Sequence, residues 1–228
     1  MKAMILAAGH GTRMRPLTNH TPKPLLKVGG KPLIVWHIEK LKKAGFQDIV
    51  INIAWLGEKI PKALGDGTKL GVNIFYSDEQ EDGALETAGG IIKALPLLST
   101  VLSTTRDEPF LVTNGDVWCD YPYQPQNPLK EGKLAHLILV NNPPHHPQGD
   151  FALLQNQVEN EGKTKFTFSG IGYYHPYLFN NLEPGKRPLA PLLREAMNKG
   201  QVTGELFSGD WRDIGTPERL AELDQDLS

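Results

Sequence analysis

A glycine-rich loop directly follows the first apolar segment of the chain. Lys2–Ala7 is a short apolar run typical of a buried parallel strand, and Ala8-Gly9-His10-Gly11-Thr12-Arg13 comes next. Its two glycines let backbone amides approach a ligand without obstruction, and consecutive amides in such a turn form an anion-binding nest. Arg13 and Arg15 add forked cationic donors suited to phosphate oxygens. We therefore predict a phosphate-binding loop at the carboxyl end of the first strand, where open α/β sheets bind ligands.

The first half of the chain alternates segments with strand and helix patterns. The predicted strands are Lys2–Ala7, Asp48–Ile53, Val72–Ser77 and Pro109–Asn114. The predicted helices between them are Pro32–Ala44, Glu58–Leu64 and Thr87–Leu98. Pro96 marks a point where the last of these helices can end early. Such an alternation predicts an α/β fold with a parallel sheet and right-handed crossovers.

The second half is richer in strands and continues the same domain, because no linker divides the chain. Strands are predicted over Leu134–Asn141, Phe151–Leu154, Thr164–Ser169, Ile171–Tyr174 and Val202–Phe207. Helices are predicted over Pro188–Lys199 and Glu218–Asp226, each with a proline near its start. We expect a single domain over residues 1–228.

Composition excludes several classes of protein. The net charge of −2 argues against a general nucleic-acid binder. The chain has no apolar stretch of the ~18 residues that a membrane-spanning helix needs, so no membrane partner is expected. Cys119 is the only cysteine, which is typical of a protein in the reducing cytoplasm. No coiled-coil pattern is present, and we expect a monomer or a small homo-oligomer.

Three further residues are predicted to act at the same edge of the sheet. Lys23 lies in Thr21-Pro22-Lys23-Pro24-Leu25, where the flanking prolines restrict the backbone and fix the place of one ammonium group. Asp116 follows the strand that ends at Asn114, and Asp213 precedes a helix with Thr216 as its N-cap. Mg²⁺ sites on phosphate substrates use one or two carboxylates with phosphate oxygens and waters. The sequence therefore predicts a Mg²⁺ and phosphate site.

The loop differs from two common nucleotide motifs. Met14 occupies the position where the dinucleotide-binding fingerprint requires a third glycine, which disfavours a nicotinamide-dependent oxidoreductase. The Gly-Lys-Ser/Thr ending of the Walker A motif is also absent.

The segments Leu6–Thr18 and Thr21–Leu25 together resemble the signature of sugar-nucleotide pyrophosphorylases, a family of nucleotidyltransferases. The resemblance implies a Rossmann-like three-layer α/β/α fold with a mostly parallel central sheet and a smaller β-rich sugar-binding part. Residues 1 to about 120 would form the nucleotide-binding half, and about 121 to 228 the sugar-binding half. The implied nucleotide-binding residues are Ala8, Gly9, Gly11, Thr12, Arg13, Lys23, Glu79 and Leu85. Arg13, Lys23 and Asp116 would be catalytic.

By the same resemblance, Asp116 and Asp213 would bind Mg²⁺. The residues expected to face the sugar are Asn114, Asp150, Gly170 and Asp213. Glu79, or a backbone amide near Leu85, would pair with the base. His10 occupies a position where the family varies, so it is interpreted as tolerated rather than catalytic. His145 and His146 are adjacent without spaced partners, which is a poor pattern for a metal site.

One branch of the family, the N-acetylmuramate-1-phosphate uridylyltransferases of peptidoglycan recycling, resembles nearly the whole chain. The stretches that carry this resemblance include Ile51–Gly57, His145–Phe151, Phe166–Ile171 and Leu189–Arg194. It implies UTP and N-acetylmuramate 1-phosphate as substrates. Alternatives are a mannose-1-phosphate guanylyltransferase, another hexose-1-phosphate nucleotidyltransferase or a non-catalytic nucleotide-sugar-binding regulatory subunit. The last is disfavoured because the basic and acidic residues expected in catalysis are all present.

Overall fold

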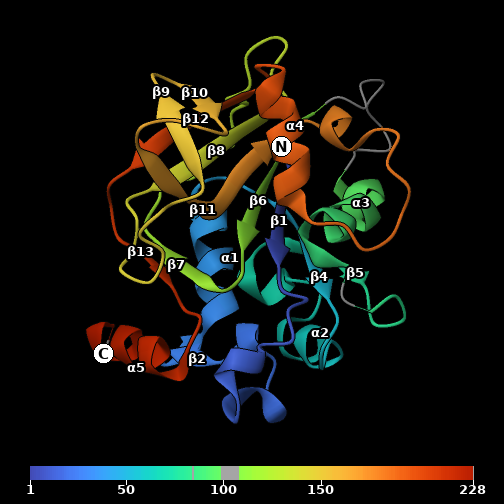
Figure 1. Cartoon of the computed structure of the whole chain (residues 1–228). Coiled ribbons are helices and arrows are strands. Elements are labelled where there is room, and N and C mark those ends of the chain that lie inside the picture. Colours follow the sequence, from blue (N-terminus) through green and yellow to red (C-terminus); the bar gives the residue numbers. More distant parts are fainter. Residues whose placement is uncertain (84, 99–107, 228) are drawn as a thin grey trace.

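A central sheet runs through the molecule (Figure 1), whose computed structural model describes residues 1–83, 85–98 and 108–227. Nine strands of the described residues form it in the order β5-β4-β1-β6-β11-β8-β12-β10-β9. The first four strands of this order are parallel to one another: β5 (Asn73–Asp78), β4 (Asp48–Ile53), β1 (Ala3–Leu6) and β6 (Phe110–Asn114). The predicted parallel sheet of the first half is confirmed.

The strands of the second half extend the same sheet with mixed directions. They are β8 (Ala135–Val140), β9 (Phe151–Leu154), β10 (Gln157–Glu159), β11 (Lys165–Tyr174) and β12 (Val202–Phe207). Strand β11 is antiparallel to both β6 and β8 and so joins the two halves, whereas β12 is parallel to β8. The parallel character of the sheet therefore belongs to the first half of the chain.

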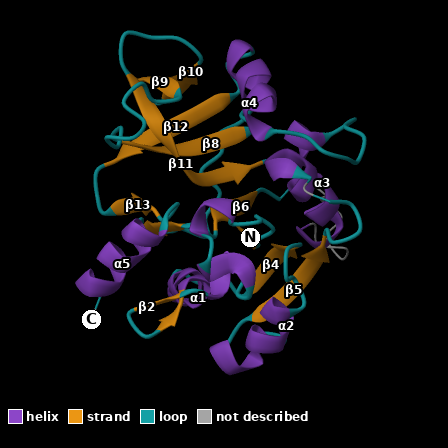
Figure 2. Cartoon of the chain, turned by 60° about the horizontal axis from the view of Figure 1, so that its bottom comes forward, coloured by secondary structure: helices purple, strands orange, loops and turns teal. Residues whose placement is uncertain are grey.

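Helices cover both faces of the sheet, as Figure 2 shows. One face packs against α1 (Leu33–Lys43) and α2 (Lys59–Leu64), and the other against α3 (Glu86–Leu98) and α4 (Leu189–Asn198). Alternate residues of each strand enter the two cores, because successive strand side chains point to opposite faces. Thus Ile5 packs with the α1 side and Met4 with the α3 side. This confirms the predicted three-layer α/β/α fold.

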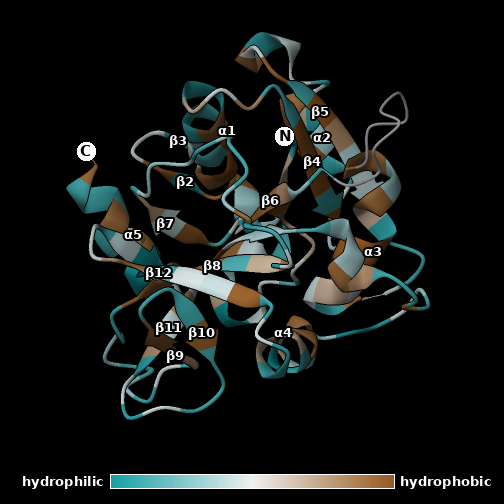
Figure 3. Ribbon diagram, turned by 90° about the horizontal axis from the view of Figure 1, so that it is seen from above, coloured by the Kyte–Doolittle hydropathy of each residue, from teal (hydrophilic) through white to brown (hydrophobic). Residues whose placement is uncertain are grey.

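Short elements complete the chain beside the main sheet. Strand β2 (Lys27–Val28) pairs with β3 (Lys31–Pro32), and β7 (Val117–Cys119) pairs with β13 (Trp211–Asp213). Helix α5 covers Pro217–Asp226. The 3₁₀ turns are Thr12–Met14, Leu17–Asn19, Lys23–Leu25, Thr68–Leu70 and Pro176–Phe179. Helix α5 packs through Leu220 and Leu223 on a small third core that includes Trp118. Figure 3 shows hydrophobic residues concentrated on inner strands such as β4.

Two details of the sequence-based prediction are corrected. The two strands expected over Thr164–Ser169 and Ile171–Tyr174 are one strand, β11, whose register against β8 shifts between Phe168 and Ile171. Pro96 lies inside α3, so it does not end that helix early. The other predicted helices and strands begin and end within one residue of those observed. None of the described helices is both long and apolar enough to cross a membrane.

Candidate active site at the carboxyl ends of the parallel strands

Strand register brings three residues into one row at the edge of the sheet. Leu6 of β1 pairs with Asn52 of β4 on one side and with Asn114 of β6 on the other. Each of these residues ends its strand or comes next to its end. Since the carboxyl ends of parallel strands meet at one edge, the phosphate loop after β1 and Asp116 after β6 are brought together there.

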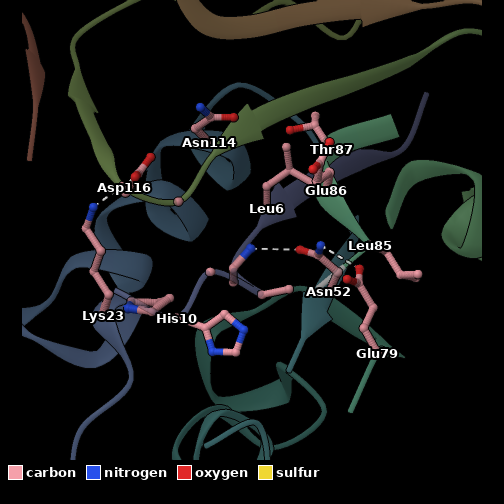
Figure 4. A pocket seen from close by; sticks show the side chains of 15 residues that line it. Leu6, His10, Lys23, Asn52, Glu79, Leu85, Glu86, Thr87, Asn114 and Asp116 are labelled. Atoms are coloured by element: carbon pink, nitrogen blue, oxygen red, sulfur yellow. Dashed lines mark hydrogen bonds and ion pairs between the residues drawn. The ribbon is translucent and has the colours of Figure 1, made fainter. Parts of the chain in front are cut away.

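A cleft of about 260 Å³ opens at this edge (Figure 4). Lys23 and Asp116 lie on one side of it, and Asn52, Glu79 and Leu85 on the other. The predicted site residues that line it are Ala8, Gly9, Lys23, Glu79, Leu85, Asn114 and Asp116. The remaining lining residues are Leu6, Ala7, His10, Pro24, Asn52, Glu86, Thr87 and Gly115.

An ion pair between Lys23 and Asp116 joins two distant parts of the sequence on one side of the cleft. Lys23 Nζ lies 2.8 Å from Asp116 Oδ2. The lysine is 8% exposed, and it begins the 3₁₀ turn Lys23–Leu25. Pro22 and Pro24 restrict the backbone on both sides of it, so little backbone entropy is lost in placing this residue. The site thus presents a buried cation beside a more exposed carboxylate.

The glycine loop is shaped by close packing at Gly11. This residue has φ of +60°, and a Cβ atom on it would lie 2.9 Å from Thr18 Cγ2. Thr18 also donates a hydrogen bond of 2.8 Å to the Gly11 carbonyl. A Cβ on Gly9 would meet no atom within 4 Å, so this backbone faces open space. Gly11, Thr12 and Arg13 are not among the residues lining the cleft.

On the opposite side, a chain of buried hydrogen bonds connects the loop to Glu79. The Ala7 N–H donates to Asn52 Oδ1 at 2.7 Å, and Asn52 Nδ2 donates to Glu79 Oε1 at 2.8 Å. Glu79 is 1% exposed, although its neighbours Asp78 and Gln80 are exposed as expected of an acidic loop. Burial raises the pKa of Glu79, while hydrogen bonds from Asn52 and the Leu85 backbone favour its ionised form. Glu79 therefore organises this wall of the cleft.

Asp213 lies next to Asp116 through the backbone. Strand β13 places it opposite Val117, and the Ile214 N–H donates to the Asp116 carbonyl at 3.0 Å. The Asp213 carboxylate accepts a hydrogen bond of 2.7 Å from Arg219 and lies 3.3 Å from His145 Nε2.

Gly215 allows Asp213 and Arg13 to come close to each other. A Cβ atom on Gly215 would lie 2.9 Å from Asp213 Oδ1 and 3.2 Å from Arg13 Nη1. Arg13 and Asp213 thus lie close to each other, and neither is among the residues that line the cleft.

The described residues contain no group of three or more His, Cys, Asp or Glu side chains that could hold a metal ion by themselves. They do provide the carboxylates of Asp116 and Asp213, whose backbones are joined beside the β7–β13 pair. This donor set fits Mg²⁺, which takes one or two carboxylates and completes its octahedron with phosphate oxygens and waters.

A second cavity, of about 430 Å³, continues from the cleft and shares Glu86, Thr87 and Asn114 with it. Asn114 and Asp150 line this cavity, as two of the residues expected to face a sugar. Gly170 lies beside Asn114, because a Cβ on Gly170 would be 2.6 Å from Asn114 Nδ2. Asp150 accepts hydrogen bonds from the Phe168 N–H at 2.8 Å and from His146 Nε2 at 3.1 Å. Three of the four predicted sugar-facing residues are therefore gathered here, with Asp213 apart from them.

Several lining residues were not anticipated from the sequence. Asn52 is a polar residue within the apolar run of residues 49–53, and this interruption is a signal that the sequence offers. Glu86 begins α3 with φ of +59° and pairs with Lys186 at 3.4 Å, and no sequence pattern indicated this conformation. Phe168 and Arg194 enter the second cavity from β11 and α4. Their role depends on tertiary contacts that no local pattern describes.

Comparison with known proteins identifies the family. The family model for nucleotidyl transferases matches residues 2–151. This chain belongs to the nucleotidyl transferase family. The matched range contains the glycine loop, Lys23, Glu79 and Asp116, and it ends at Phe151 in the wall of the second cavity.

Individual relatives agree with this membership. A Neisseria meningitidis N-acetylmuramate alpha-1-phosphate uridylyltransferase is 54% identical over 97% of this chain and 96% of its own length. The mannose-1-phosphate guanyltransferase beta-A of Xenopus laevis is 30% identical over 96% of this chain, which spans 62% of that protein.

Solved structures agree on the fold. A Bacillus anthracis protein assigned as a glucose-1-phosphate thymidylyltransferase superposes with a TM-score of 0.81 at 24% identity, covering 100% of this chain and 95% of its own. The expected nucleotidyltransferase fold and enzyme class are confirmed.

Proposed function

We propose that this nucleotidyltransferase transfers a uridylyl group from UTP to N-acetylmuramate 1-phosphate with the help of Mg²⁺, giving UDP-N-acetylmuramate and pyrophosphate. The uridylyltransferase of N. meningitidis, 54% identical over nearly its whole length, supports this choice of substrates. The reaction would serve peptidoglycan recycling in the cytoplasm.

The observation that carries the proposal is the Lys23–Asp116 pair in a cleft that shares part of its lining with a second cavity. The pair lies in the cleft that also contains the glycine loop, and Asn114 lines both the cleft and the second cavity. A nucleotide in the cleft and a sugar in the second cavity would meet with their phosphates between them. That arrangement suits transfer between two bound phosphates, since a joined site replaces an encounter in solution by a positioned one.

The chemistry needs no covalent intermediate on the protein. The sugar phosphate oxygen is already anionic, so it can attack the α-phosphorus of the nucleotide in line while pyrophosphate leaves. Lys23 and Arg13 offset the repulsion between the two anions and stabilise charge in the transition state. Asp116 and Asp213 would hold Mg²⁺, which when bound neutralises charge on the phosphate oxygens. Asn114 and Asp150 would orient the sugar.

The test is pyrophosphate release by the purified protein with four nucleoside triphosphates and two sugar phosphates. UTP, GTP, dTTP and CTP are each combined with N-acetylmuramate 1-phosphate and with mannose 1-phosphate. We expect release with UTP and N-acetylmuramate 1-phosphate, and its loss when Mg²⁺ is chelated. Release only with GTP and mannose 1-phosphate would keep the reaction class but refute the proposed substrates.

A further inference from the structure

We propose that Arg194 recognises a carboxylate on the sugar ring, and so selects acidic sugar 1-phosphates over neutral ones. This inference rests on the proposed function, because N-acetylmuramate differs from N-acetylglucosamine by a lactyl ether that ends in a carboxylate. It assigns the cavity beyond the reacting phosphates a specific chemical preference.

The residues that line the second cavity divide into an apolar surface and a few polar groups. Its apolar residues are Phe151, Phe168, Pro188, Leu189, Ala190 and Leu193. This surface suits the methyl groups and ring face of an N-acetylated sugar. Arg194 is the only cation among the described residues that line the cavity.

The two carboxylates in the same cavity already have partners. Asp150 accepts hydrogen bonds from the Phe168 N–H and from His146 Nε2. Glu86 lies 3.4 Å from the Lys186 ammonium group. Neither carboxylate forms an ion pair with Arg194. The anionic groups of the cavity therefore do not occupy the guanidinium.

Arg194 itself is held in place without a direct ion pair, and its charge makes only the smallest of the contributions that lower the pKa of the nearby Glu161. Its guanidinium carbon lies 5.2 Å from the centre of the Phe151 ring, an aromatic contact that orients the planar group. One N–H reaches Asn160 Oδ1 at 3.5 Å, which is a weak contact with a neutral acceptor. The neighbouring Glu161 pairs with Lys165 at 2.9 Å. Among the described residues, Arg194 forms no ion pair of its own within 4.0 Å.

A guanidinium in this state matches a carboxylate ligand. Its planar fork can give two parallel N–H···O bonds to the two oxygens of a carboxylate, which a neutral hydroxyl cannot accept in the same way. Helix α4 and strand β9 carry the arginine and the ring beneath it, so both come from regular elements of the fold.

The experiment measures kcat and KM of the wild-type enzyme and of Arg194→Gln with UTP and two sugar phosphates. The substrates are N-acetylmuramate 1-phosphate and N-acetylglucosamine 1-phosphate, which lacks the lactyl group. The control variant is Lys199→Gln, at the residue that directly follows the same helix and pairs with Glu195. A third substrate, N-acetylmuramate 1-phosphate with its carboxylate methylated, tests the same contact in the wild-type protein without any mutation.

We expect Arg194→Gln to lower kcat/KM for N-acetylmuramate 1-phosphate about tenfold, mainly through KM, because the contact is charge-assisted but open to solvent. The neutral sugar phosphate should change by less than about twofold, and Lys199→Gln should match wild type. Methylation of the substrate should cost the wild-type enzyme about as much as the mutation does.

Equal losses with both sugars, or no loss with either, would overturn the role of Arg194 and leave the proposed function standing. A methyl ester used as well as the free acid by the wild-type enzyme would also refute the carboxylate contact. If the wild-type enzyme used other sugar phosphates but not N-acetylmuramate 1-phosphate, both the inference and the proposed substrates would fall.

Discussion

The cleft beside the glycine loop and the cavity beyond Asn114 are built in different ways. The cleft is made from loops and strand ends of the parallel half, tied together by buried hydrogen bonds from Ala7 through Asn52 to Glu79. The cavity is lined by side chains from β9, β11 and α4 in the mixed half. Strand register and backbone hydrogen bonds thus determine the shape of the cleft. The shape of the cavity depends on side chains that can be substituted without changing the fold. We infer that the fold itself positions the groups for the reaction, whereas the choice of sugar depends on a few side chains that line the cavity.

The largest expected effect is a loss of kcat/KM on removal of Lys23 or Asp116, and it distinguishes the reaction step from the selection of the sugar. Lys23→Ala and Asp116→Ala should each lower kcat/KM at least ~10²-fold, the scale of losing one preorganised charge in a reaction site. Because both groups are proposed to act on the phosphates, the loss should be similar for every sugar phosphate that the wild type uses. Initial rates of pyrophosphate release measure it, with the exposed Lys27→Ala as control. Near-normal activity in either folded variant would refute their catalytic role.

A second prediction concerns the buried histidine behind Asp116. The pKa of His37 is lowered to about 4, first by burial and then by the Lys40 ammonium group, while Asp116 and a bond to the Val117 backbone act in the opposite direction. Between about pH 6.5 and 4 the unfolded chain therefore binds a proton that the folded chain does not. Stability should fall as the pH falls through this window, by up to about 3 kcal/mol from this group, and level off below it.

Urea unfolding at intervals from pH 7.5 to 4 measures this dependence. His37→Gln should be less sensitive to pH across the same range, whereas His20→Gln, at an exposed site, should keep the wild-type slope. Identical slopes in all three proteins would show that His37 does not titrate in this way.

The next prediction concerns the stability contributed by the buried hydrogen bonds of Asn52 in the wall of the cleft. Asn52→Leu removes both bonds of the amide and leaves the Ala7 N–H and the Glu79 carboxyl short of a partner, which should cost about 2 kcal/mol of stability. The matched control is Asn73→Leu, since Asn73 also donates to a carboxylate, that of Asp48 at 2.8 Å, but is exposed. We expect the control to change the free energy of unfolding by less than about 0.5 kcal/mol. Equal losses in the two variants would contradict the structural role of the buried network.

The same contrast explains what could be predicted from the sequence. The parallel strands, the glycine loop and Lys23 follow from local patterns, because short apolar runs, glycines and prolines act on their own neighbourhood. The gathering of Ala8, Gly9, Lys23 and Asp116 in one cleft followed from the rule that such strands end at one edge.

Other features depend on contacts between distant segments. Residues Trp211–Asp213 form a strand only because they pair with β7, so no local pattern indicated it. The sequence does not show the continuity of β11 through Gly170, because a glycine inside a strand pattern indicates a break. In the structure Gly170 has φ of +81°, and β8 pairs with the strand on both sides of it. Arg194 could not be assigned from the sequence, since its relation to the cavity depends on how α4 packs beside β9.

The smallest expected effect lies where the two regions meet, at Gly170. Alanine at φ of +81° would be strained by about 1–2 kcal/mol, and its Cβ would lie 2.6 Å from Asn114 Nδ2. Because Asn114 faces both cavities, displacing its amide should lower kcat/KM for the sugar phosphate about tenfold and leave the KM for the nucleotide unchanged. Gly200→Ala is the matched control, a positive-φ glycine whose Cβ would meet no atom within 4 Å. If Gly170→Ala instead raised the KM for both substrates equally, Asn114 would influence the binding of nucleotide and sugar phosphate alike. The cleft and the cavity would then not be separable in their effects on substrate binding.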